Sequence, residues 1–229
     1  MIIGGLQKNS FIDCPGKIAA VVFTAGCNLR CPYCHNFRLL SADNDNISLD
    51  ELYAFLQKRR NQLEAVVISG GEPTIHSDLP ELMRNIKKMD FALKLDTNGT
   101  RPQMLETLIE QALPDYVAMD LKAVFSEYAN LSADGNKLGD ALEESMRLIG
   151  QSGLPGEFRI TCAAPFINEQ SIVELASLLT TYAPHLPLWL QPVKWENSIN
   201  PAYAQNFPPP SLERLRQLAL TKVNNCHIR

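Results

Sequence analysis

Residues 17–36 of the chain read KIAAVVFTAGCNLRCPYCHN. The first eight of these residues form an apolar run rich in alanine and valine, which predicts a buried strand over residues 17–24. Cys27, Cys31 and Cys34 follow this run directly. In α/β proteins the loops at the carboxyl ends of the strands form the functional site. The stretch therefore predicts an α/β fold whose chemistry lies at the carboxyl ends of its strands.

The rest of the chain continues this alternation of apolar runs and helical segments. Further strands are predicted at residues 65–69, 91–95, 116–120, 157–161 and 188–191. Helices are predicted at residues 48–62, 78–88, 102–112, 139–149, 169–181 and 211–219, and a long loop at 130–137. The first helix opens with a capping box, because Glu51 follows Ser48 by three residues. This alternation predicts a parallel sheet, either open and twisted or curled into a barrel, and periodicity does not choose between the two.

Length and composition indicate one ordinary globular domain over residues 1–229. The chain is 45% apolar and 20% charged, with a formal net charge of −4. This charge argues against a nucleic-acid partner, because such partners bind to basic faces. The longest apolar run, residues 18–25, is far shorter than the roughly 20 residues that span a bilayer, and no secretory signal is visible at the start. We therefore expect a cytoplasmic protein with no membrane partner, whose six cysteines stay reduced.

The three clustered cysteines have the spacing Cys-x3-Cys-x2-Cys. A [4Fe–4S] cluster has four irons, so a loop with three thiolates leaves one iron open to an outside molecule. A structural zinc ion needs a fourth ligand, and His35 is poorly placed to supply it because it adjoins Cys34. The loop therefore favours an iron–sulfur cluster, with a zinc site as the alternative. The remaining cysteines are expected to be small buried thiols: Cys14, Cys162 and Cys226.

Polar residues follow the other predicted strands in the same way. They are Gly70, Gly71 and Glu72 after the second strand, Asp96, Asn98 and Gly99 after the third, Asp120 and Lys122 at the end of the fourth, and Gln191 and Lys194 after the sixth. Loops at the carboxyl ends of such strands converge. We therefore expect these residues to share one rim with the cysteines.

The stretch GCNLRCPYCHN at residues 26–36 resembles the signature loop of the radical S-adenosylmethionine superfamily. The resemblance implies that Cys27, Cys31 and Cys34 hold a [4Fe–4S] cluster whose open iron binds the amino and carboxylate groups of S-adenosylmethionine. In that family the reduced cluster cleaves the sulfonium to give methionine and a 5′-deoxyadenosyl radical. The resemblance also implies a partial (β/α)6 TIM-like barrel.

The same resemblance implies roles for residues around the cofactor. Gly70-Gly71-Glu72 is similar to the family's Gly-Gly-Glu motif, which holds the methionine amino group. A tight turn with a solvated glutamate is the alternative interpretation. Tyr33 is expected to pack near the adenine, unless it is only structural, and residues 33–35, which include His35, are expected to offer backbone contacts.

Two further segments resemble those of glycyl-radical-enzyme activases. They are Asp96-Thr97-Asn98-Gly99 and Met119-Asp120-Leu121-Lys122, which in those relatives contribute to binding S-adenosylmethionine and, in some members, a monovalent cation. Without the resemblance, Asn-Gly indicates a turn with positive φ, and the charged residues could form a salt bridge inside a barrel. Arg159 and Lys194 are further candidates for the carboxylate and ribose of the cofactor. Lys94 shares a strand face with Asp96 and is left without a role.

The amino-terminal segment narrows the resemblance. GGLQKNS at residues 4–10, DCPGK at 13–17 and Cys-His-Asn at 34–36 look like the activating proteins of anaerobic ribonucleoside-triphosphate reductase. These proteins remove a hydrogen from a backbone glycine of their partner. The resemblance therefore implies a glycyl radical enzyme as protein substrate and a flavodoxin- or ferredoxin-type electron donor.

Other targets and other classes of protein stay open. Pyruvate formate-lyase activases carry Asp-Gly-Pro-Gly-x-Arg at residues 13–18, whereas this chain has Cys14 and Ile18 at the Gly and Arg positions. A small-molecule radical enzyme, such as a 7-carboxy-7-deazaguanine synthase, is the alternative within the superfamily. A non-catalytic zinc-binding module is the alternative outside it.

Overall fold

The computed structural model describes residues 1–41 and 46–229. The chain divides into two compact units, each built from separate stretches of the sequence. Unit 1 consists of Met1–Cys27, Arg38–Thr97 and Gln103–Val117, and unit 2 of Asn28–Phe37, Asn98–Pro102 and Ala118–Arg229. The interpretation of residues 1–229 as a single domain stays a prediction.

The strands of unit 1 are neighbours in the order of the chain. They are β1 (Ile3–Ser10), β2 (Ala19–Thr24), β3 (Ala65–Gly70) and β4 (Ala92–Thr97), while β5 (Tyr116–Leu121) begins in unit 1 and continues into unit 2. β1 pairs antiparallel with β2, whereas β2, β3 and β4 pair in parallel. The register sets Val21 beside Val67 and Val67 beside Lys94, so these side chains share one face of the sheet.

The helices that follow β2, β3 and β4 are α1 (Leu49–Arg59), α2 (Leu79–Lys87) and α3 (Pro102–Glu110), with the short 3-10 helices η1 (Phe37–Leu40) and η2 (Pro73–Ile75). The predicted capping box of α1 is confirmed. The Ser48 hydroxyl accepts a hydrogen bond from the Glu51 amide at 3.2 Å, and the Glu51 carboxylate accepts one from the Ser48 amide at 2.9 Å. Two otherwise unpaired amide donors are satisfied in this way.

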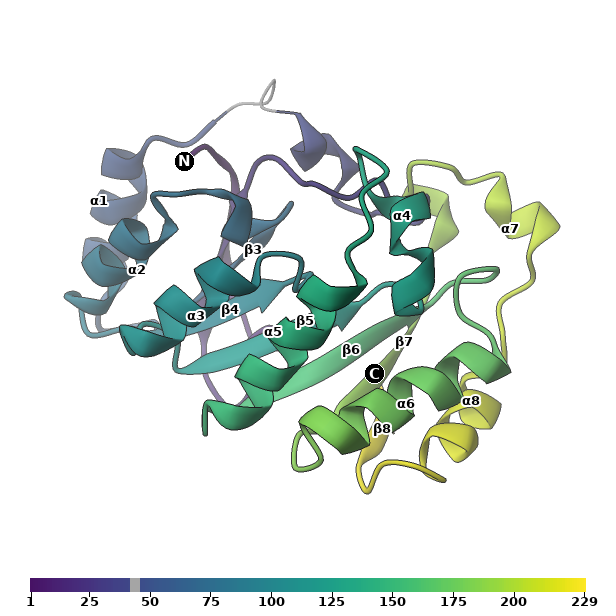
Figure 1. The fold of residues 1–229 in the computed structure, drawn as a ribbon. Helices are drawn as coiled ribbons and strands as arrows, with labels where there is room; N and C mark the ends of the chain where they lie inside the picture. The colour runs from purple at the N-terminus through teal and green to yellow at the C-terminus, as the bar shows by residue number, and fades with distance from the viewer. Residues whose placement is uncertain (42–45) are drawn as a thin grey trace. The chain divides into compact units, whose positions relative to one another are not determined.

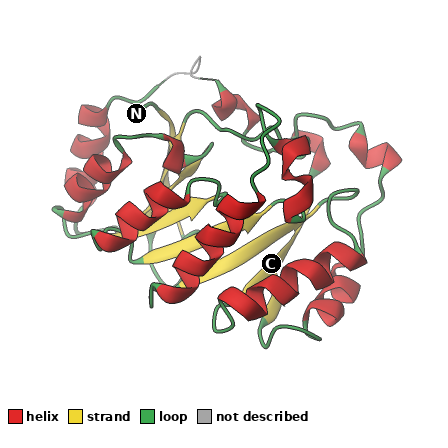
Figure 2. Ribbon diagram, in the orientation of Figure 1, coloured by secondary structure: helices red, strands yellow, loops and turns green. Residues whose placement is uncertain are grey.

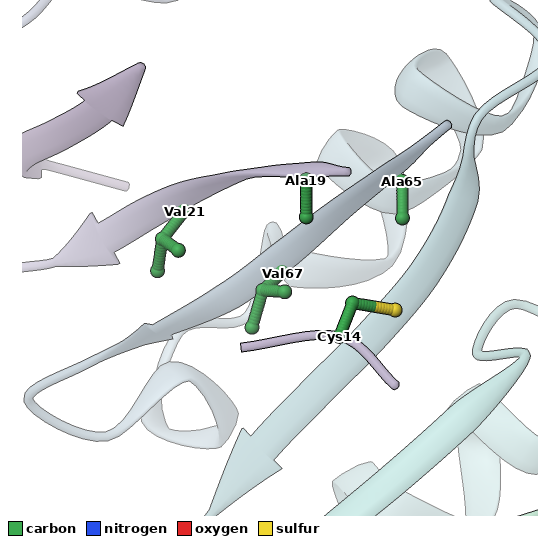
Figure 3. Close-up of a cluster of buried hydrophobic side chains, with 5 residues drawn as sticks. All are labelled: Cys14, Ala19, Val21, Ala65 and Val67. Atoms are coloured by element: carbon green, nitrogen blue, oxygen red, sulfur yellow. The ribbon is translucent and has the colours of Figure 1, made fainter. Parts of the chain in front are cut away.

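A cluster of small apolar side chains fills one face of the unit 1 sheet. It consists of Cys14, Ala19, Val21, Ala65 and Val67, all buried (Figure 3). Period-two alternation along β2 and β3 sets the two pairs on the same face, and Cys14 packs against them from the loop between β1 and β2. Cys14 is therefore the small buried thiol that the sequence predicts.

Unit 2 holds the remainder of β5 and the strands β6 (Gly156–Cys162), β7 (Leu188–Pro192) and β8 (Cys226–Ile228), with β6, β7 and β8 paired in parallel. Its helices are α4 (Tyr128–Leu131), α5 (Gly139–Gln151), α6 (Glu169–Tyr182), α7 (Tyr203–Asn206) and α8 (Leu212–Ala219), with η3 (Phe125–Glu127) and η4 (Trp195–Asn197). α6 and α8 lie side by side (Figure 1), and α8 also packs on β7 and β8.

The predicted alternation is confirmed. The predicted strands are present as β2 to β7, and the predicted helices as α1, α2, α3, α5, α6 and α8 (Figure 2). The sequence interpretation missed β1 and β8, and α4 ends at Leu131 inside the predicted loop at residues 130–137. Within the described ranges, no helix is long and apolar enough to cross a membrane.

Candidate active site

In unit 1, the Gly70-Gly71 turn at the end of β3 lies directly against the backbone that leads into Cys27. The Gly71 amide donates to the Thr24 carbonyl at 2.9 Å, and the Glu72 amide donates to the Gly26 carbonyl at 2.8 Å. A Cβ on Gly71 would lie 1.9 Å from the Gly26 oxygen and 3.4 Å from the Cys27 Cβ. Position 71 therefore needs glycine because two segments of the chain approach closely there.

Glu72 is buried beside this turn, with 1% of its surface exposed. One carboxylate oxygen accepts hydrogen bonds from the Thr74 amide at 3.1 Å, the Thr74 hydroxyl at 2.5 Å and the Thr97 hydroxyl at 2.7 Å. The alternative of a turn with a solvated glutamate is therefore wrong. Burying a carboxylate is costly unless it is hydrogen-bonded, so these donors fix Glu72 and, through it, the turn. Thr74 and Thr97 are site residues that the sequence interpretation missed.

His76 is a second missed residue in unit 1. Its Nε2 donates to the Ala25 carbonyl at 2.8 Å, two residues before Cys27. Burial lowers the pKa of this imidazole, which favours the neutral ring. The backbone before Cys27 is thus held both by the glycine turn and by a histidine.

Asp96 and Lys94 form an ion pair on β4 within unit 1. The Lys94 Nζ lies 2.6 Å from the Asp96 Oδ1, and the two side chains are 1% and 12% exposed. Successive odd or even residues of a strand share a face, which brings the two together. This is the salt bridge that the alternative interpretation of Asp96 predicts, and a role in cofactor binding stays a proposal.

In unit 2, the second half of the cysteine loop is fixed by backbone contacts. The Cys34 amide donates to the Cys31 carbonyl at 3.0 Å. Leu29 pairs with Ser132, and the Arg30 amide donates to the Leu131 carbonyl at 2.7 Å. The predicted loop at 130–137 therefore contributes a short backbone pairing to the cysteine loop, which no local pattern in the sequence indicates.

Tyr33 is anchored within unit 2. It is 4% exposed, and its hydroxyl donates to the Lys122 carbonyl at 2.7 Å. Its ring lies edge-on to Trp195, with centroids 6.3 Å apart, and at 5.6 Å from Phe166. Tyr203 in turn stacks on Trp195 at 5.4 Å. These contacts give Tyr33 a structural role, and a second role near an adenine stays a proposal.

Two cationic side chains flank the Asp120 carboxylate in unit 2. Arg159 Nε lies 2.7 Å and Lys122 Nζ 3.0 Å from its two carboxylate oxygens. Burial alone would raise the pKa of Asp120, but the charges of Arg159 and Lys122 outweigh it and hold that pKa well below its usual range. Burial also raises the pKa of the Cys34 thiol, while the charge of Lys122 acts in the opposite direction. Arg159 is therefore placed as a partner of Asp120.

The Asn98-Gly99 turn joins the cysteine loop within unit 2. Gly99 has a φ of +74°, as the sequence predicts for this turn. Asn98 is 5% exposed; its amide nitrogen donates to Asn28 Oδ1 at 3.1 Å, and its oxygen accepts from the Thr100 hydroxyl at 2.6 Å. Asn28 also donates to the Thr100 hydroxyl oxygen at 2.7 Å. Asn98 therefore holds Asn28, which makes Asn28 and Thr100 further residues that the sequence interpretation missed.

The two remaining candidates lie near the surface of unit 2. His35 and Lys194 are both exposed, and the backbone of Lys194 forms a hydrogen bond to His35. Partial desolvation lowers the pKa of the exposed His35, and the charge of Lys194 lowers it further. A contact of either residue with a cofactor stays a prediction.

The residues present fit the predicted cluster by their donor chemistry. Three cysteines stand in one short loop whose backbone is held by hydrogen bonds, and thiolates are the ligands that iron–sulfur clusters take. Among the described residues, no three Cys, His, Asp or Glu side chains gather around one point as they would around a single ion. A [4Fe–4S] cluster does not require such a point, because each thiolate binds a different iron.

Residues 21–179 match the model of the Radical SAM superfamily. The chain therefore belongs to this superfamily, and the partial barrel that the superfamily shares is the fold that the sequence predicts. Within the superfamily, the chain is 34% identical to a Methanocaldococcus jannaschii protein named as a glycyl-radical enzyme activating enzyme, over 76% of this chain and 74% of that protein. A second protein of that organism with the same kind of name is 28% identical over 98% of this chain and 85% of its own length.

Solved structures share the fold. A domain of a pyruvate-formate lyase-activating enzyme from Bacteroides vulgatus has a TM-score of 0.55 at 20% identity, covering 72% of this chain and 98% of that one. SuiB of Streptococcus suis bound to its precursor peptide SuiA has a TM-score of 0.66 at 16% identity, covering 91% of this chain. This chain spans 48% of the length of that SuiB chain. At these identities the likeness concerns the fold alone.

Proposed function

We propose that this chain activates a glycyl radical enzyme, by removing a hydrogen from one backbone glycine of that partner. The observation that carries the proposal is the 34% identity, over 76% of the chain, to a protein named as such an activating enzyme. The resemblance of residues 4–10 and 13–17 makes the large subunit of anaerobic ribonucleoside-triphosphate reductase the first candidate partner. A flavodoxin- or ferredoxin-type donor and a cytoplasmic location complete the proposal.

Cys27, Cys31 and Cys34 hold the cluster in this proposal. A [4Fe–4S] cluster held by these residues would supply the electron for reductive cleavage of S-adenosylmethionine. The chain holds the backbone beside these cysteines in place through hydrogen bonds. The 2.8 Å hydrogen bond between the Glu72 amide and the Gly26 carbonyl holds the backbone before Cys27, and the pairing of Arg30 with Leu131 holds the segment before Cys31.

The methionine end of S-adenosylmethionine binds through the Gly70-Gly71-Glu72 turn in this proposal. Backbone carbonyls of the turn would accept hydrogen bonds from the amino group. Glu72 acts as a positioning residue, because Thr74 and Thr97 already donate to its carboxylate at 2.5 and 2.7 Å. Asp120, with its partners Arg159 and Lys122, binds the polar groups of the cofactor, and Tyr33 packs beside the adenine.

Cys14 has no chemical role in this proposal, although it stands where pyruvate formate-lyase activases carry glycine. Its side chain is 5% exposed and packs among the alanines and valines of β2 and β3. Burial raises the pKa of this thiol, so it stays protonated and unreactive. The replacement of glycine by cysteine therefore fills the apolar core of unit 1.

The test is electron paramagnetic resonance of the anaerobically reconstituted protein, mixed with S-adenosylmethionine, a strong chemical reductant and the reductase subunit. We expect a glycyl doublet on the subunit and one 5′-deoxyadenosine per radical formed. The control is a subunit whose radical-bearing glycine is changed to alanine, which must give no doublet. A doublet on pyruvate formate-lyase instead would transfer the chain to that class of activase. Release of 5′-deoxyadenosine that depends on a small molecule, with no doublet on either protein, would overturn the proposal.

A further inference from the structure

Lys94 is a buried cation in the apolar interior of unit 1. It lies in the middle of β4, in register with Val67, and its side chain is 1% exposed. Val67 belongs to the cluster of Cys14, Val21 and two alanines, so the face beside the lysine is apolar. Charged lysines are almost never fully buried unless they are paired. A charged lysine at this position therefore needs a partner of opposite charge.

That partner is Asp96, whose Oδ1 lies 2.6 Å from the Lys94 Nζ. The ammonium also lies 5.7 Å from the centre of the Tyr116 ring, within the range of a cation–π interaction. An ammonium is a compact point charge with three donors. The structure thus provides Asp96 with a positive charge fixed on its own strand, in a place that solvent hardly reaches.

This arrangement does not fit the monovalent cation that some activases bind near these carboxylates. Sodium and potassium need oxygen ligands, and Asp96 Oδ1 already accepts a hydrogen bond from the Lys94 ammonium. A second cation on the same carboxylate would be repelled by Lys94, and the repulsion is strong where water is excluded. In unit 2, Asp120 is likewise bonded to two cationic side chains, Arg159 and Lys122.

We propose that Lys94 is the built-in counter-ion of Asp96 and takes the place of a bound monovalent cation, so that this chain binds S-adenosylmethionine independently of potassium and sodium. The inference rests on the proposed function, because it assigns Asp96 to the cofactor site. Lys94 is then a positioning residue. It holds the Asp96 carboxylate in one orientation through the 2.6 Å contact, and it does so without a ligand that could dissociate.

The test measures S-adenosylmethionine affinity of the cluster-loaded protein by calorimetry, in potassium, sodium or choline chloride at equal ionic strength. For the wild-type protein we expect the three dissociation constants to agree within about two-fold, because screening is the same at equal ionic strength. Lys94→Met keeps the length of the side chain and removes its charge. We expect its affinity in choline chloride to fall about ten-fold or more, as for the loss of a charge-assisted hydrogen bond, and to recover in potassium or sodium chloride.

Two control variants separate this role from a merely structural ion pair. Lys58→Met removes an exposed lysine of α1 in the same unit and should leave every dissociation constant unchanged. Lys94→Met/Asp96→Asn restores charge balance, so it folds even if the single variant does not. Because it lacks the carboxylate that would bind an added cation, its affinity should not respond to potassium. Coupling between two ligands is reciprocal, so S-adenosylmethionine should also raise the potassium affinity of Lys94→Met. The measurement is the shift in melting temperature that potassium causes, with and without S-adenosylmethionine.

A wild-type affinity that rises several-fold with potassium would overturn the inference, as would a Lys94→Met protein that binds S-adenosylmethionine equally well in all three salts. A potassium response retained by the double variant would also overturn it, because the cation would then bind elsewhere. A wild-type protein that does not bind S-adenosylmethionine at all would refute the proposed function instead. In that case the melting temperatures of Lys94→Met in potassium and choline chloride would still report whether Lys94 replaces a cation.

Discussion

Replacement of Gly71 by alanine tests how the chain holds the first cysteine of its signature loop. The new Cβ would lie 1.9 Å from the Gly26 carbonyl oxygen and 2.7 Å from the Gly26 carbonyl carbon. Heavy atoms make favourable contact only at about 3.5 Å or more, so the turn and the backbone before Cys27 must separate by about 1.5 Å. That movement breaks the hydrogen bond of 2.8 Å between Glu72 and Gly26 and strains the one of 2.9 Å between Gly71 and Thr24.

The expected cost follows from these two effects. Loss of one or two backbone hydrogen bonds costs about 1–3 kcal/mol, and overpacking adds about 1–3 kcal/mol. For a chain of this size each kcal/mol lowers the melting temperature by about 2–4 °C. Gly71→Ala should therefore melt at least about 4 °C below the wild-type protein. It should also retain less iron after reconstitution, because Cys27 adjoins the displaced backbone.

The assay is thermal unfolding of the cluster-free protein, followed by iron and sulfide analysis of the reconstituted protein. Gly5→Ala in β1 is the matched control. It lies in the same unit, and its added Cβ would meet only the Phe23 side chain at an ordinary contact of 3.6 Å. We expect this control to melt within about 2 °C of the wild-type protein. Gly71→Ala with the wild-type melting temperature and full iron content would show that the close approach at position 71 is not needed.

Two further predictions concern ionisable groups of unit 2. Burial raises the pKa of Cys162 to about 12 and that of Cys226 to about 11. Both thiols should therefore resist iodoacetamide at about pH 8 until the protein unfolds. Peptide mass spectrometry measures the labelling, and labelling of either cysteine at the rate of a free peptide would contradict the prediction. Asp120→Asn should destabilise the protein by about 2 kcal/mol near neutral pH, since a partly exposed carboxylate between two cations is lost. Because the folded pKa of Asp120 lies below its usual value, its stabilisation is present above about pH 4 and is lost as pH falls further. Urea titrations at several pH values should show that the difference in free energy of unfolding between the wild-type protein and the variant shrinks below about pH 4. A difference that grows in acid would contradict the assignment.

The regular elements could be predicted because their signals are local. Runs such as residues 65–69 are apolar on both faces, which is typical of parallel strands, and the capping box at Ser48 is a pattern of four residues. β1 was missed because its sequence, IGGLQKNS, has glycines and polar residues, and three of its residues are exposed at the edge of unit 1. β8 was missed because it has only three residues.

The contacts within the candidate site could be predicted only in part. Strand ends identified Glu72 and Asp96, because the carboxyl ends of parallel strands carry function. The register of β3 and β4 brings the Thr97 hydroxyl to Glu72 and sets Lys94 beside Val67. No single segment encodes this register. The pairing of residues 29 and 132 is likewise a long-range contact.

The carboxylates of the proposed cofactor site each have partners of their own, and this decides how their variants must be interpreted. Glu72 is bound by hydroxyls, Asp96 by Lys94, and Asp120 by Arg159 and Lys122. A cofactor that binds to such groups exchanges hydrogen bonds, so its net gain is far smaller than the strength of each contact in isolation. Removing Asp120 alone also takes from Arg159, which is 11% exposed, its carboxylate at 2.7 Å and leaves it the Glu157 carboxylate at 3.9 Å. That penalty can exceed the lost contact with the cofactor. Only a cycle that compares Asp120→Asn, Arg159→Gln and the double variant separates the two contributions. If Asp120 contacts the cofactor, the double variant should regain stability but not affinity for S-adenosylmethionine. If Asp120 serves only its ion pair, both should recover together.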